Sequence, residues 1–368
     1  AIDGKIVIGV TAGECALSGF LDAYDAGNGK RLWRTYTTPQ KGDPARATWA
    51  GDSADYGGAP TWMTGTYTWP GPLGKDLVTN SGAAANGVCS TIAFDSRGRI
   101  VTVCVSTVAP PQARIVDPET LAVIDTFDLP NADPVGNSPA YQNFSAGGYF
   151  FLNNRNQLVI PTRTNHIFVL GQTPDGSQFQ LVRDYDLTSV VDPATERMNS
   201  ALPDFDGDLW FVVKQSGEVG TVNRKSGKVR VLNLGEGIQN SFTVDRDGVY
   251  VVTSKRIYRL GKAGNGKPFV VWSAKYRNDG KQKPGQADAG TGTTPDVMTG
   301  GYVSMVDNAN PENVVVYRTA KKLKGKKRKV CEVPVFKKNG SATENSRFTV
   351  AGLRRSRSDQ PSSDGPCL

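Results

Sequence analysis

NSALPDFDGDLWFVV (199–213) and NSFTVDRDGVYVV (240–252) are two stretches of the chain that follow one pattern. Each begins with Asn-Ser, continues as a short apolar strand, turns at Asp-x-Asp-Gly and ends in a second strand. Two short strands joined by a Gly-containing polar turn predict a β-hairpin. Because no downstream glutamate completes an EF-hand after either Asp-x-Asp-Gly, we expect turns there rather than calcium loops. Further copies of the pattern begin at Cys89, Asn143, Thr293 and Asn345.

The repeats predict an all-β protein, and their length predicts a β-propeller. Units of roughly fifty residues with three or four short strands each are typical of propeller blades. Five full repeats occupy residues 89–340 and a sixth ends after its first strand, so strands within 4–36 should complete a sixth blade and close the ring with both termini. Seven blades are the alternative, with further strands in residues 46–86. We expect one propeller domain over 1–350 and a disordered basic and polar tail over 351–368.

The composition supports this fold class and excludes several functions. The chain has 368 residues with 41 Gly and 22 Pro but only 21% charged residues, which favours strands and turns over helices. It has no long apolar run, so we expect no membrane span. Its single histidine, His166, excludes a multi-histidine metal site and c-type haem attachment. His166 lies in an expected strand, where a structural role is favoured over a catalytic one.

The positive charge of the chain is local. Seven basic residues lie within 321–329 and three arginines within 354–357, and the remaining residues carry a net charge of −2 against +8 for the whole chain. Such a run is either a solvated loop or a surface that contacts a polyanion or an acidic membrane. Nucleic-acid recognition is not expected, because no aromatic residue is interleaved with the lysines to stack on bases.

Two of the five cysteines lie in one predicted hairpin, VCSTIAFDSRGRIVTVCVS (88–106). A turn at Ser96-Arg97 pairs Asp95 with Gly98 and places Cys89 opposite Cys104. Directly opposed Cβ atoms in an antiparallel pair lie about 4.5–5.5 Å apart, close to the disulfide range. The pattern therefore predicts a Cys89–Cys104 disulfide, with two reduced core cysteines as the alternative. A disulfide would place the protein in an oxidising, extracytoplasmic compartment, secreted or periplasmic.

The N-terminal region resembles a segment of the quinoprotein alcohol dehydrogenases, propeller enzymes that use pyrroloquinoline quinone (PQQ) and calcium. The matching runs are GKIVIGVTAGE (4–14), GFLDAYDAGNGKRLWRTYT (19–37), TWAGDS (48–53) and GGAPTW (57–62). This resemblance implies a cofactor site in which Thr11, Ala12 and Gly13 contact the quinone through the backbone and Glu14 binds Ca²⁺. It also implies that Trp62 stacks on the quinone plane. Ca²⁺ prefers carboxylate oxygens and a flat quinone suits an aromatic ring, so the residue types agree with these roles.

The chain departs from the quinoprotein pattern beyond Trp62. The family's calcium-binding asparagine, in a Gly-Thr-Gly-Asn-Pro element, can only correspond to Asn80 in VTNSG (78–82). The catalytic base of the family has no counterpart that we can place, so no catalytic residue is assigned. Half of a cofactor site is therefore visible in the sequence.

Residues 60–350 resemble a second group, secreted bacterial propellers known as "PQQ-binding-like" and largely uncharacterised. The stretches CSTIAFDSRGRIV (89–101) and NSFTVDRDGVYVVT (240–253) carry this resemblance, as does TTPDVMTGGYVSMVDNANPENVVVYR (293–318). It implies the propeller fold and almost nothing about mechanism.

A second metal site is conceivable in the central channel. Asn199, Asn240 and Asn345 begin equivalent innermost strands, so their amides should point into one end of the channel. Together with Glu14 or Glu344 they could bind Ca²⁺, as in the calcium-dependent propeller lactonases and gluconolactonases that this arrangement resembles. The other interpretation is that Asn-Ser satisfies backbone groups at strand starts.

Three functions follow from these alternatives. The first is a quinoprotein-like oxidoreductase that oxidises a small alcohol or carbohydrate with PQQ and Ca²⁺. The second is a calcium-dependent propeller hydrolase of the lactonase kind. The third is a non-catalytic extracellular binding propeller.

Overall fold

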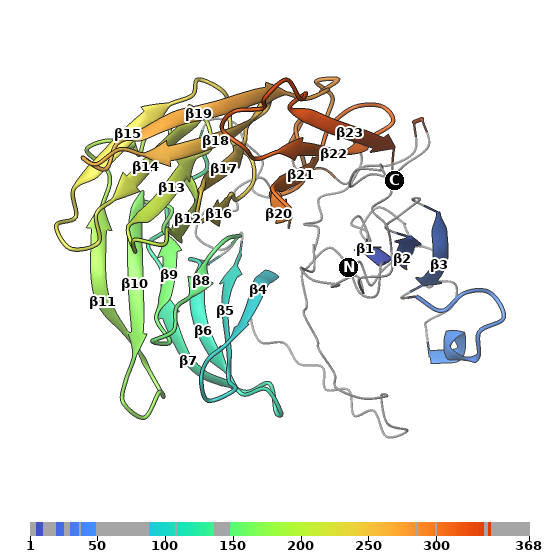
Figure 1. The fold of residues 1–368 in the computed structure, drawn as a ribbon. Coiled ribbons are helices and arrows are strands. Elements are labelled where there is room, and N and C mark those ends of the chain that lie inside the picture. Colours follow the sequence, from blue (N-terminus) through green and yellow to red (C-terminus); the bar gives the residue numbers. More distant parts are fainter. Residues whose placement is uncertain are drawn as a thin grey trace, which may run out of the picture. The chain divides into compact units, whose positions relative to one another are not determined.

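In the computed structural model of the chain, the regular secondary structure of the described residues is almost entirely β-strand (Figure 1). The structure describes residues 5–9, 20–25, 30–36, 38–48, 88–106, 109–135, 148–283, 286, 288–298, 300–334 and 338–339. These ranges hold 23 strands and one short 3-10 helix, Pro44–Thr48.

The strands of the described ranges form six antiparallel sheets, and within each sheet the strands are neighbours in chain order. The N-terminal sheet has three strands, β1 (Lys5–Gly9), β2 (Phe20–Asp25) and β3 (Arg31–Tyr36). The other five sheets have four strands each. The first two of these are β4 (Val88–Phe94), β5 (Ile100–Val105), β6 (Gln112–Val116) and β7 (Val123–Asp128), and then β8 (Phe151–Leu152), β9 (Leu158–Pro161), β10 (His166–Gln172) and β11 (Phe179–Asp186). The remaining three are β12 (Met198–Pro203), β13 (Leu209–Val213), β14 (Glu218–Val222) and β15 (Val229–Asn233); β16 (Thr243–Asp245), β17 (Gly248–Val252), β18 (Arg256–Lys262) and β19 (Pro268–Lys275); and β20 (Asp296–Met298), β21 (Tyr302–Val306), β22 (Asn313–Arg318) and β23 (Lys329–Pro334).

These four-stranded antiparallel sheets in chain order are the blades of a β-propeller, and they confirm the predicted fold class. The three-stranded N-terminal sheet also agrees with the prediction that this blade begins without its first strand. The segment predicted to supply that strand, 345–350, lies outside the described residues, as do most of residues 46–86 and the whole tail 351–368. Ring closure, the seven-blade alternative and the domain limits therefore stay predictions.

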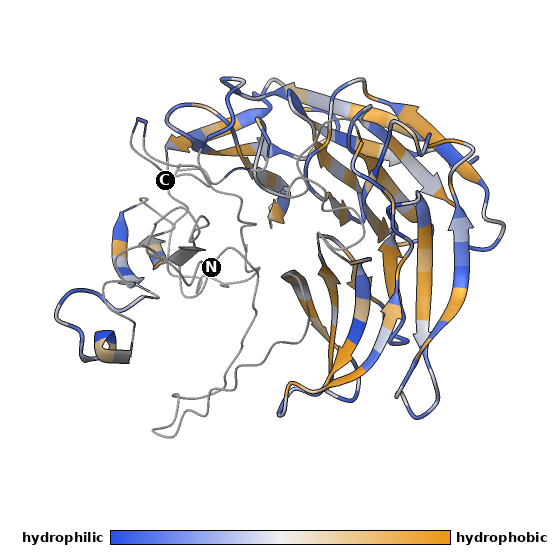
Figure 2. Ribbon diagram, turned by 180° about the vertical axis from the view of Figure 1, so that it is seen from behind, coloured by the Kyte–Doolittle hydropathy of each residue, from blue (hydrophilic) through white to orange (hydrophobic). Residues whose placement is uncertain are grey.

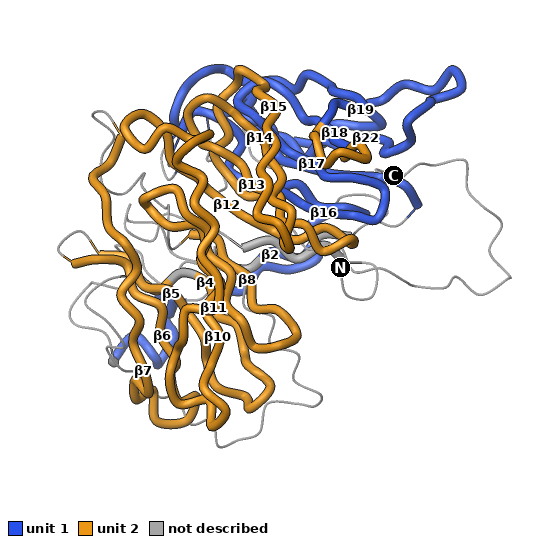
Figure 3. Tube along the Cα trace, turned by 90° about the vertical axis from the view of Figure 1, so that its left-hand side faces the viewer, with its two compact units in different colours: residues 1–63, 242–261, 269–368 blue, residues 64–241, 262–268 orange. Residues whose placement is uncertain are grey.

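The chain divides into two compact units (Figure 3). Unit 1 comprises Ala1–Met63, Phe242–Gly261 and Phe269–Leu368, and unit 2 comprises Thr64–Ser241 and Lys262–Pro268. The sheets β4–β7, β8–β11 and β12–β15 belong to unit 2.

Hydrophobic residues run along the strands and the connecting loops are mostly hydrophilic (Figure 2). Central strands are apolar throughout where both faces of a sheet are covered: all five residues of β13, LWFVV, are buried. Outer strands alternate instead, and β7 buries none of its residues fully. This gradient from inner to outer strand is expected when sheets pack face to face.

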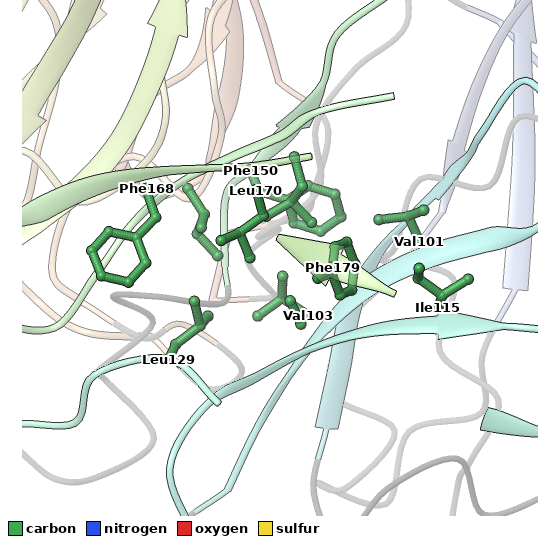
Figure 4. Packing of buried hydrophobic residues seen from close by; sticks show 11 residues of the cluster. Val101, Val103, Ile115, Leu129, Phe150, Phe168, Leu170 and Phe179 are labelled. Atoms are coloured by element: carbon green, nitrogen blue, oxygen red, sulfur yellow. The ribbon is translucent and has the colours of Figure 1, made fainter. Parts of the chain in front are cut away.

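Neighbouring sheets of unit 2 share their hydrophobic cores. One cluster joins β5 and β6 to β9, β10 and β11, and Figure 4 shows its side chains gathered between the two sheets. Its members include Val101, Val103, Ile115, Leu158, Ile160, Leu170 and Phe179. A second cluster joins β9 and β10 to β12, β13 and β14 through residues that include Ile167, Met198, Phe211 and Val213. Fully burying one such side chain stabilises the fold by about 1.5–3 kcal/mol.

Unit 1 has a core of the same kind. Tyr250, Ile257 and Trp272 of the β16–β19 sheet pack with Met305 and Tyr317 of the β20–β23 sheet. The tyrosine and tryptophan rings are nearly or fully buried. The two units are thus built by the same packing rule.

The predicted disulfide is present: Cys89 on β4 is bonded to Cys104 on β5. The expected register at the turn is wrong, however. Phe94 lies opposite Ile100, and the backbone N–H of Asp95 donates to the carbonyl of Arg99. Gly98, the predicted partner of Asp95, lies within the turn. A register shift between Cys89 and Ile92 then moves β4 by one residue and brings the two cysteines opposite each other. A β-bulge of this kind inserts one extra residue into a strand, and it cannot be read from the turn sequence.

Other features bear on the compartment of the protein. Cys331 on β23 is disulfide-bonded as well. Disulfides form and persist in oxidising compartments. Within the described residues no helix is long and apolar enough to cross a membrane.

Candidate functional site

The residues predicted to hold PQQ and calcium lie outside the described residues. They are Thr11, Ala12, Gly13, Glu14, Trp62 and Asn80. The strands that flank the first four are described: β1 ends at Gly9, which lies opposite Leu21 of β2. The segment that carries Glu14 therefore connects two paired strands at one end of the N-terminal sheet.

That end of the N-terminal sheet holds a buried ion pair. Asp22 of β2 is 2% exposed and accepts two hydrogen bonds of 2.7 Å from the guanidinium of Arg34 on β3. The same guanidinium lies 3.6 Å from the ring centroid of Phe20. The hydrogen bond to Asp22 raises the pKa of Arg34 above its ordinary value. Bidentate pairs fix geometry as well as charge, so β2 and β3 are locked together where the predicted cofactor segment joins the sheet.

Two of the three asparagines of the alternative channel site are described, and both are buried. Asn199 donates a hydrogen bond of 2.7 Å to the carbonyl of Gln239, and the side-chain oxygen of Asn240 accepts one of 2.6 Å from the hydroxyl of Tyr149. The following serines, Ser200 and Ser241, hydrogen-bond to each other at 2.7 Å. The contacts of Asn199 and Ser200 join the starts of two consecutive repeats, and that of Asn240 reaches an earlier repeat, in line with the structural interpretation of Asn-Ser. Asn345 lies outside the described residues, and the calcium site stays a prediction.

An open polar pocket of about 530 Å³ lies in unit 2. One wall is the sheet β12–β15, where Thr221 of β14 pairs with Arg230 of β15. The other wall is the turn that joins β18 to β19. The lining residues are Asp206, Asp208, Thr221, Asn223, Ser226, Lys228, Arg230, Lys262, Ala263, Gly264, Asn265 and Gly266.

A lysine bound by three aspartates forms one end of this pocket. Lys262 Nζ lies 2.5 Å from Asp204, 2.9 Å from Asp208 and 3.3 Å from Asp206. Burial alone would lower the pKa of Lys262, but the hydrogen bonds to Asp204 and Asp208 outweigh it and raise the pKa. The ammonium group of Lys262 therefore occupies the position that a metal ion would take among these carboxylates. Within the described residues, no group of three or more His, Cys, Asp or Glu side chains is placed to hold a metal ion.

Two further cations line the pocket at the start of the outer strand. Arg230 lies on β15, and Lys228 directly precedes that strand. Neither forms an ion pair with any described residue, whereas Asp206 keeps its carboxylate 81% exposed. The lining of the pocket thus combines cations with an accessible carboxylate, an amide and hydroxyl groups. Such a set can bind a ligand that carries both an anionic group and hydroxyl groups.

His166 is held on both sides by carboxylates of β11. Its Nδ1 lies 2.8 Å from Asp184 and its Nε2 lies 3.7 Å from Asp186. The ring also meets Phe168 edge to face. With both nitrogens directed at aspartates of the neighbouring strand, His166 joins β10 to β11, which agrees with the expected structural role.

Sequence reasoning missed Lys262. The Asp-x-Asp-Gly run at 204–207 was expected to form a turn, and Asp204 does accept hydrogen bonds from the backbone of Asp206 and Asp208. Lys262 belongs to the next repeat, 58 residues further along the chain. No local pattern predicts that contact, because it depends on how consecutive sheets pack.

Comparisons with known proteins give local and partial similarity. No protein-family model matches the chain. A protein of Archaeoglobus fulgidus described as uncharacterized is 28% identical over 252 residues, which cover 63% of this chain and 46% of that protein. Quinohemoprotein alcohol dehydrogenases ADH-IIG and ADH IIB of Pseudomonas putida are each 38% identical over 79 residues, covering 18% of this chain and 11% of each enzyme. The chain therefore matches less than half the length of these relatives.

Two solved structures superpose on much of the chain with low sequence identity. Virginiamycin B lyase from Staphylococcus aureus superposes with a TM-score of 0.46 and 14% identity, covering 91% of this chain and 89% of that one. The Dos1 propeller superposes with a TM-score of 0.46 and 9% identity, covering 68% of this chain and 59% of that one.

Proposed function

We propose that the chain is a quinoprotein-like oxidoreductase that oxidises an alcohol or a sugar outside the cytoplasm. The observation that carries this proposal is the 38% identity over 79 residues to two quinohemoprotein alcohol dehydrogenases. The disulfide between Cys89 and Cys104 supports the oxidising compartment.

The residues that would hold the cofactor are those of the N-terminal segment. Glu14 and the side-chain oxygen of Asn80 supply the hard oxygen ligands that Ca²⁺ prefers, and Trp62 supplies an aromatic face. A bound quinone would supply the electron acceptor. The Asp22–Arg34 pair would hold the sheet end from which the Glu14 segment departs.

The test is reconstitution of the full chain with PQQ and CaCl₂, followed by removal of unbound cofactor. We expect quinone absorbance to stay with the protein and dye-linked alcohol oxidation to appear. Glu14→Gln should weaken calcium and quinone retention together, because ligand charge sets calcium affinity. Trp62→Ala should weaken quinone retention while leaving calcium binding largely intact.

Matched controls separate the cofactor site from general effects. Glu119→Gln changes an exposed acid in a turn of unit 2, and Trp33→Ala removes a tryptophan that is 41% exposed on β3. Both variants should retain quinone as the wild type does. If the wild type retains no quinone at saturating Ca²⁺, the oxidoreductase proposal fails.

A second candidate is a binding propeller, and the polar pocket of unit 2 favours it. None of the described residues that line the pocket is aromatic, so recognition there would depend on charge and hydrogen bonds. Lys228 and Arg230 suit a carboxylate, while Asp206 and Ser226 suit hydroxyl groups. The ligand class that combines these groups is a sugar acid.

Calorimetric titration with glucuronate, and with glucose as the neutral comparison, tests this candidate. We expect the Lys228→Gln/Arg230→Gln double variant to lose glucuronate binding, and Lys225→Gln, at an exposed neighbouring position, to keep it. Equal binding of glucose and glucuronate, or no binding of either, would exclude a sugar-acid site. Quinone retention is measured on the same variants and should not change.

A further inference from the structure

The β22–β23 hairpin of unit 1 carries the strongest concentration of positive charge in the described chain. Five lysines of its loop are exposed to solvent. These are Lys321, Lys322, Lys324, Lys326 and Lys327. We infer that this hairpin is a docking surface for an anionic polysaccharide, a role independent of the proposed oxidoreductase activity.

The base of the loop is fixed by arginines and a tryptophan. Arg328 donates hydrogen bonds of 2.6 Å to the carbonyls of Arg318 and Ala320, and its guanidinium lies 4.3 Å from the ring centroid of Trp272. Arg259 donates to the carbonyl of Thr319 at 2.6 Å. Trp272 Nε1 donates to that same carbonyl at 3.0 Å. The loop is therefore presented on a packed base.

Backbone carbonyls, rather than carboxylates, accept the hydrogen bonds of Arg259 and Arg328 at this base. No carboxylate of a described residue forms an ion pair with Arg259, Arg318 or Arg328, nor with the five loop lysines. The one acid of β23, Glu332, is already taken by Lys329 and by Arg277, whose Nε lies 2.5 Å away. Eight positive charges thus lie together without a counter-charge from the part of the chain that the structure describes.

The cations of the base also repel one another. Burial lowers the pKa of Arg328, and the charge of Arg259 lowers it further. A region where like charges are held close and only dipoles compensate them is stabilised by an external polyanion, because each contact relieves repulsion and releases counterions.

The chemistry of the loop selects the kind of polyanion. Leu323 is the only apolar side chain between Lys321 and Lys327, and it is half-buried, so the loop offers no ring on which a base could stack. Lysines are flexible point charges, which suit an irregular row of anionic groups better than one fixed geometry. The disulfides indicate an oxidising compartment, where anionic polysaccharides occur. The shared chemistry is a chain of sulfate or carboxylate groups on sugars.

The experiment measures fluorescence anisotropy of labelled heparin (sulfated) and labelled polygalacturonate (carboxylated) with the full chain, between 50 and 300 mM NaCl. Five neutralised charges on a flexible polymer predict a slope of about −3.5 for log K against log salt concentration. The variant with all five loop lysines changed to Gln should bind at least about 30-fold more weakly at the lowest salt and lose most of this slope.

The control variant removes the same charge elsewhere. Lys41, Lys225, Lys255, Lys267 and Lys281 are exposed and form no ion pair with a described residue, and changing all five to Gln should weaken binding far less. Thermal melting checks that both variants fold, and the smaller Lys326→Gln/Lys327→Gln change gives an intermediate loss if the full set does not fold.

The comparison of polymers decides the partner. Binding of heparin alone assigns sulfate groups, and binding of both polymers assigns anionic sugars in general. Tighter binding of a single-stranded oligonucleotide of equal charge would overturn the polysaccharide assignment in favour of nucleic acid. No binding by the wild type, or equal loss in the control variant, would overturn the docking surface itself.

Discussion

Lys262 in unit 2 and the lysine hairpin in unit 1 handle positive charge in opposite ways. Lys262 is 15% exposed and meets three carboxylates within 3.3 Å. At the base of the hairpin, Arg328 and Arg259 of β18 donate hydrogen bonds to backbone carbonyls, and neither these arginines nor the loop lysines pair with a described carboxylate. The cation of the first group is paired with carboxylates, and the cations of the second group are not.

This difference separates a structural role from a binding role. Removing one member of a compensated cluster exposes the charges that remain, whereas removing a member of an uncompensated cluster relieves them. The Lys262 cluster should therefore matter for folding. The hairpin should matter for what the protein binds.

Buried carboxylates of the two units show the same contrast. Asp95 in unit 2 is paired with Arg99 at 2.7 Å. Burial alone would raise the pKa of Asp95, but hydrogen bonds from Arg99 outweigh it and hold the pKa below its ordinary value. Asp307 in unit 1 accepts hydrogen bonds from amides of Ala309 and Asn313, and its nearest cation, Arg277 Nε, is 3.9 Å away; burial raises the pKa of Asp307 despite these contacts.

The largest expected effect is that of Lys262→Met. It leaves the largely buried carboxylates of Asp204 and Asp208 without their cation, and breaking a buried pair from one side costs about 3 kcal/mol. Urea unfolding at pH 7 measures the loss. Lys228→Met, at an exposed lysine of the same pocket, should change stability by no more than about 0.5 kcal/mol. Equal effects of the two changes would mean that the aspartates are well solvated without Lys262.

The Lys262 cluster also shows which features of the molecule the sequence does not predict. The repeat pattern predicted the blades, because strands and polar turns are local properties of the chain, and it predicted that Cys89 and Cys104 pair. It did not predict the bulge between Cys89 and Ile92, since one extra residue in a strand leaves no mark in a turn sequence. Nor did it predict that Lys262 would meet Asp204, because that contact depends on packing between repeats. The predicted cofactor residues, Glu14 among them, rest on resemblance alone.

The next largest effect concerns Asp95 and Asp307, whose contributions to stability should depend on pH in opposite directions. A carboxyl group with a depressed pKa contributes stability that is present above its unfolded pKa of about 3.9 and is lost as the pH falls. Asp95→Asn should therefore destabilise by about 2 kcal/mol at pH 7, and the difference from wild type should shrink below pH 4. A carboxyl group with a raised pKa contributes stability at low pH that is lost as the pH rises.

The stability of Asp307→Asn relative to the wild type should accordingly increase as the pH rises from 4 to 7. Unfolding measured at several pH values for the wild type and both variants checks this pair. The same sign of pH dependence for the two variants would show that the close ion pair of Asp95 and the mainly amide contacts of Asp307 stabilise the charged carboxylate equally.

A smaller loss is expected for Arg328→Leu. The change removes two hydrogen bonds to carbonyls and a guanidinium that stacks on Trp272, each worth about 1 kcal/mol at most, but it also relieves repulsion with Arg259. We expect a net destabilisation of about 1 kcal/mol in thermal melts, well below that of Lys262→Met. A loss of stability as large as that of Lys262→Met would mean that Arg328 is compensated as Lys262 is. The contrast between the Lys262 cluster and the hairpin would then be wrong.

The smallest expected effect is a gain in stability, not a loss. Changing the five exposed loop lysines to Gln removes like charges that no described carboxylate compensates, so the variant should be more stable than the wild type at low salt, by about 0.5 kcal/mol. Salt screens exposed charges over about 10 Å at 0.1 M, so the gain should fade as NaCl is raised toward 1 M. Thermal melting at 10 mM, 100 mM and 1 M NaCl measures this trend, with the quintuple change at Lys41, Lys225, Lys255, Lys267 and Lys281 as the charge-matched control. Scattered lysines repel one another weakly, so the control should gain less. A hairpin variant that is less stable than the wild type at every salt concentration would mean that its lysines have partners within the protein, and the hairpin would then resemble Lys262 rather than differ from it.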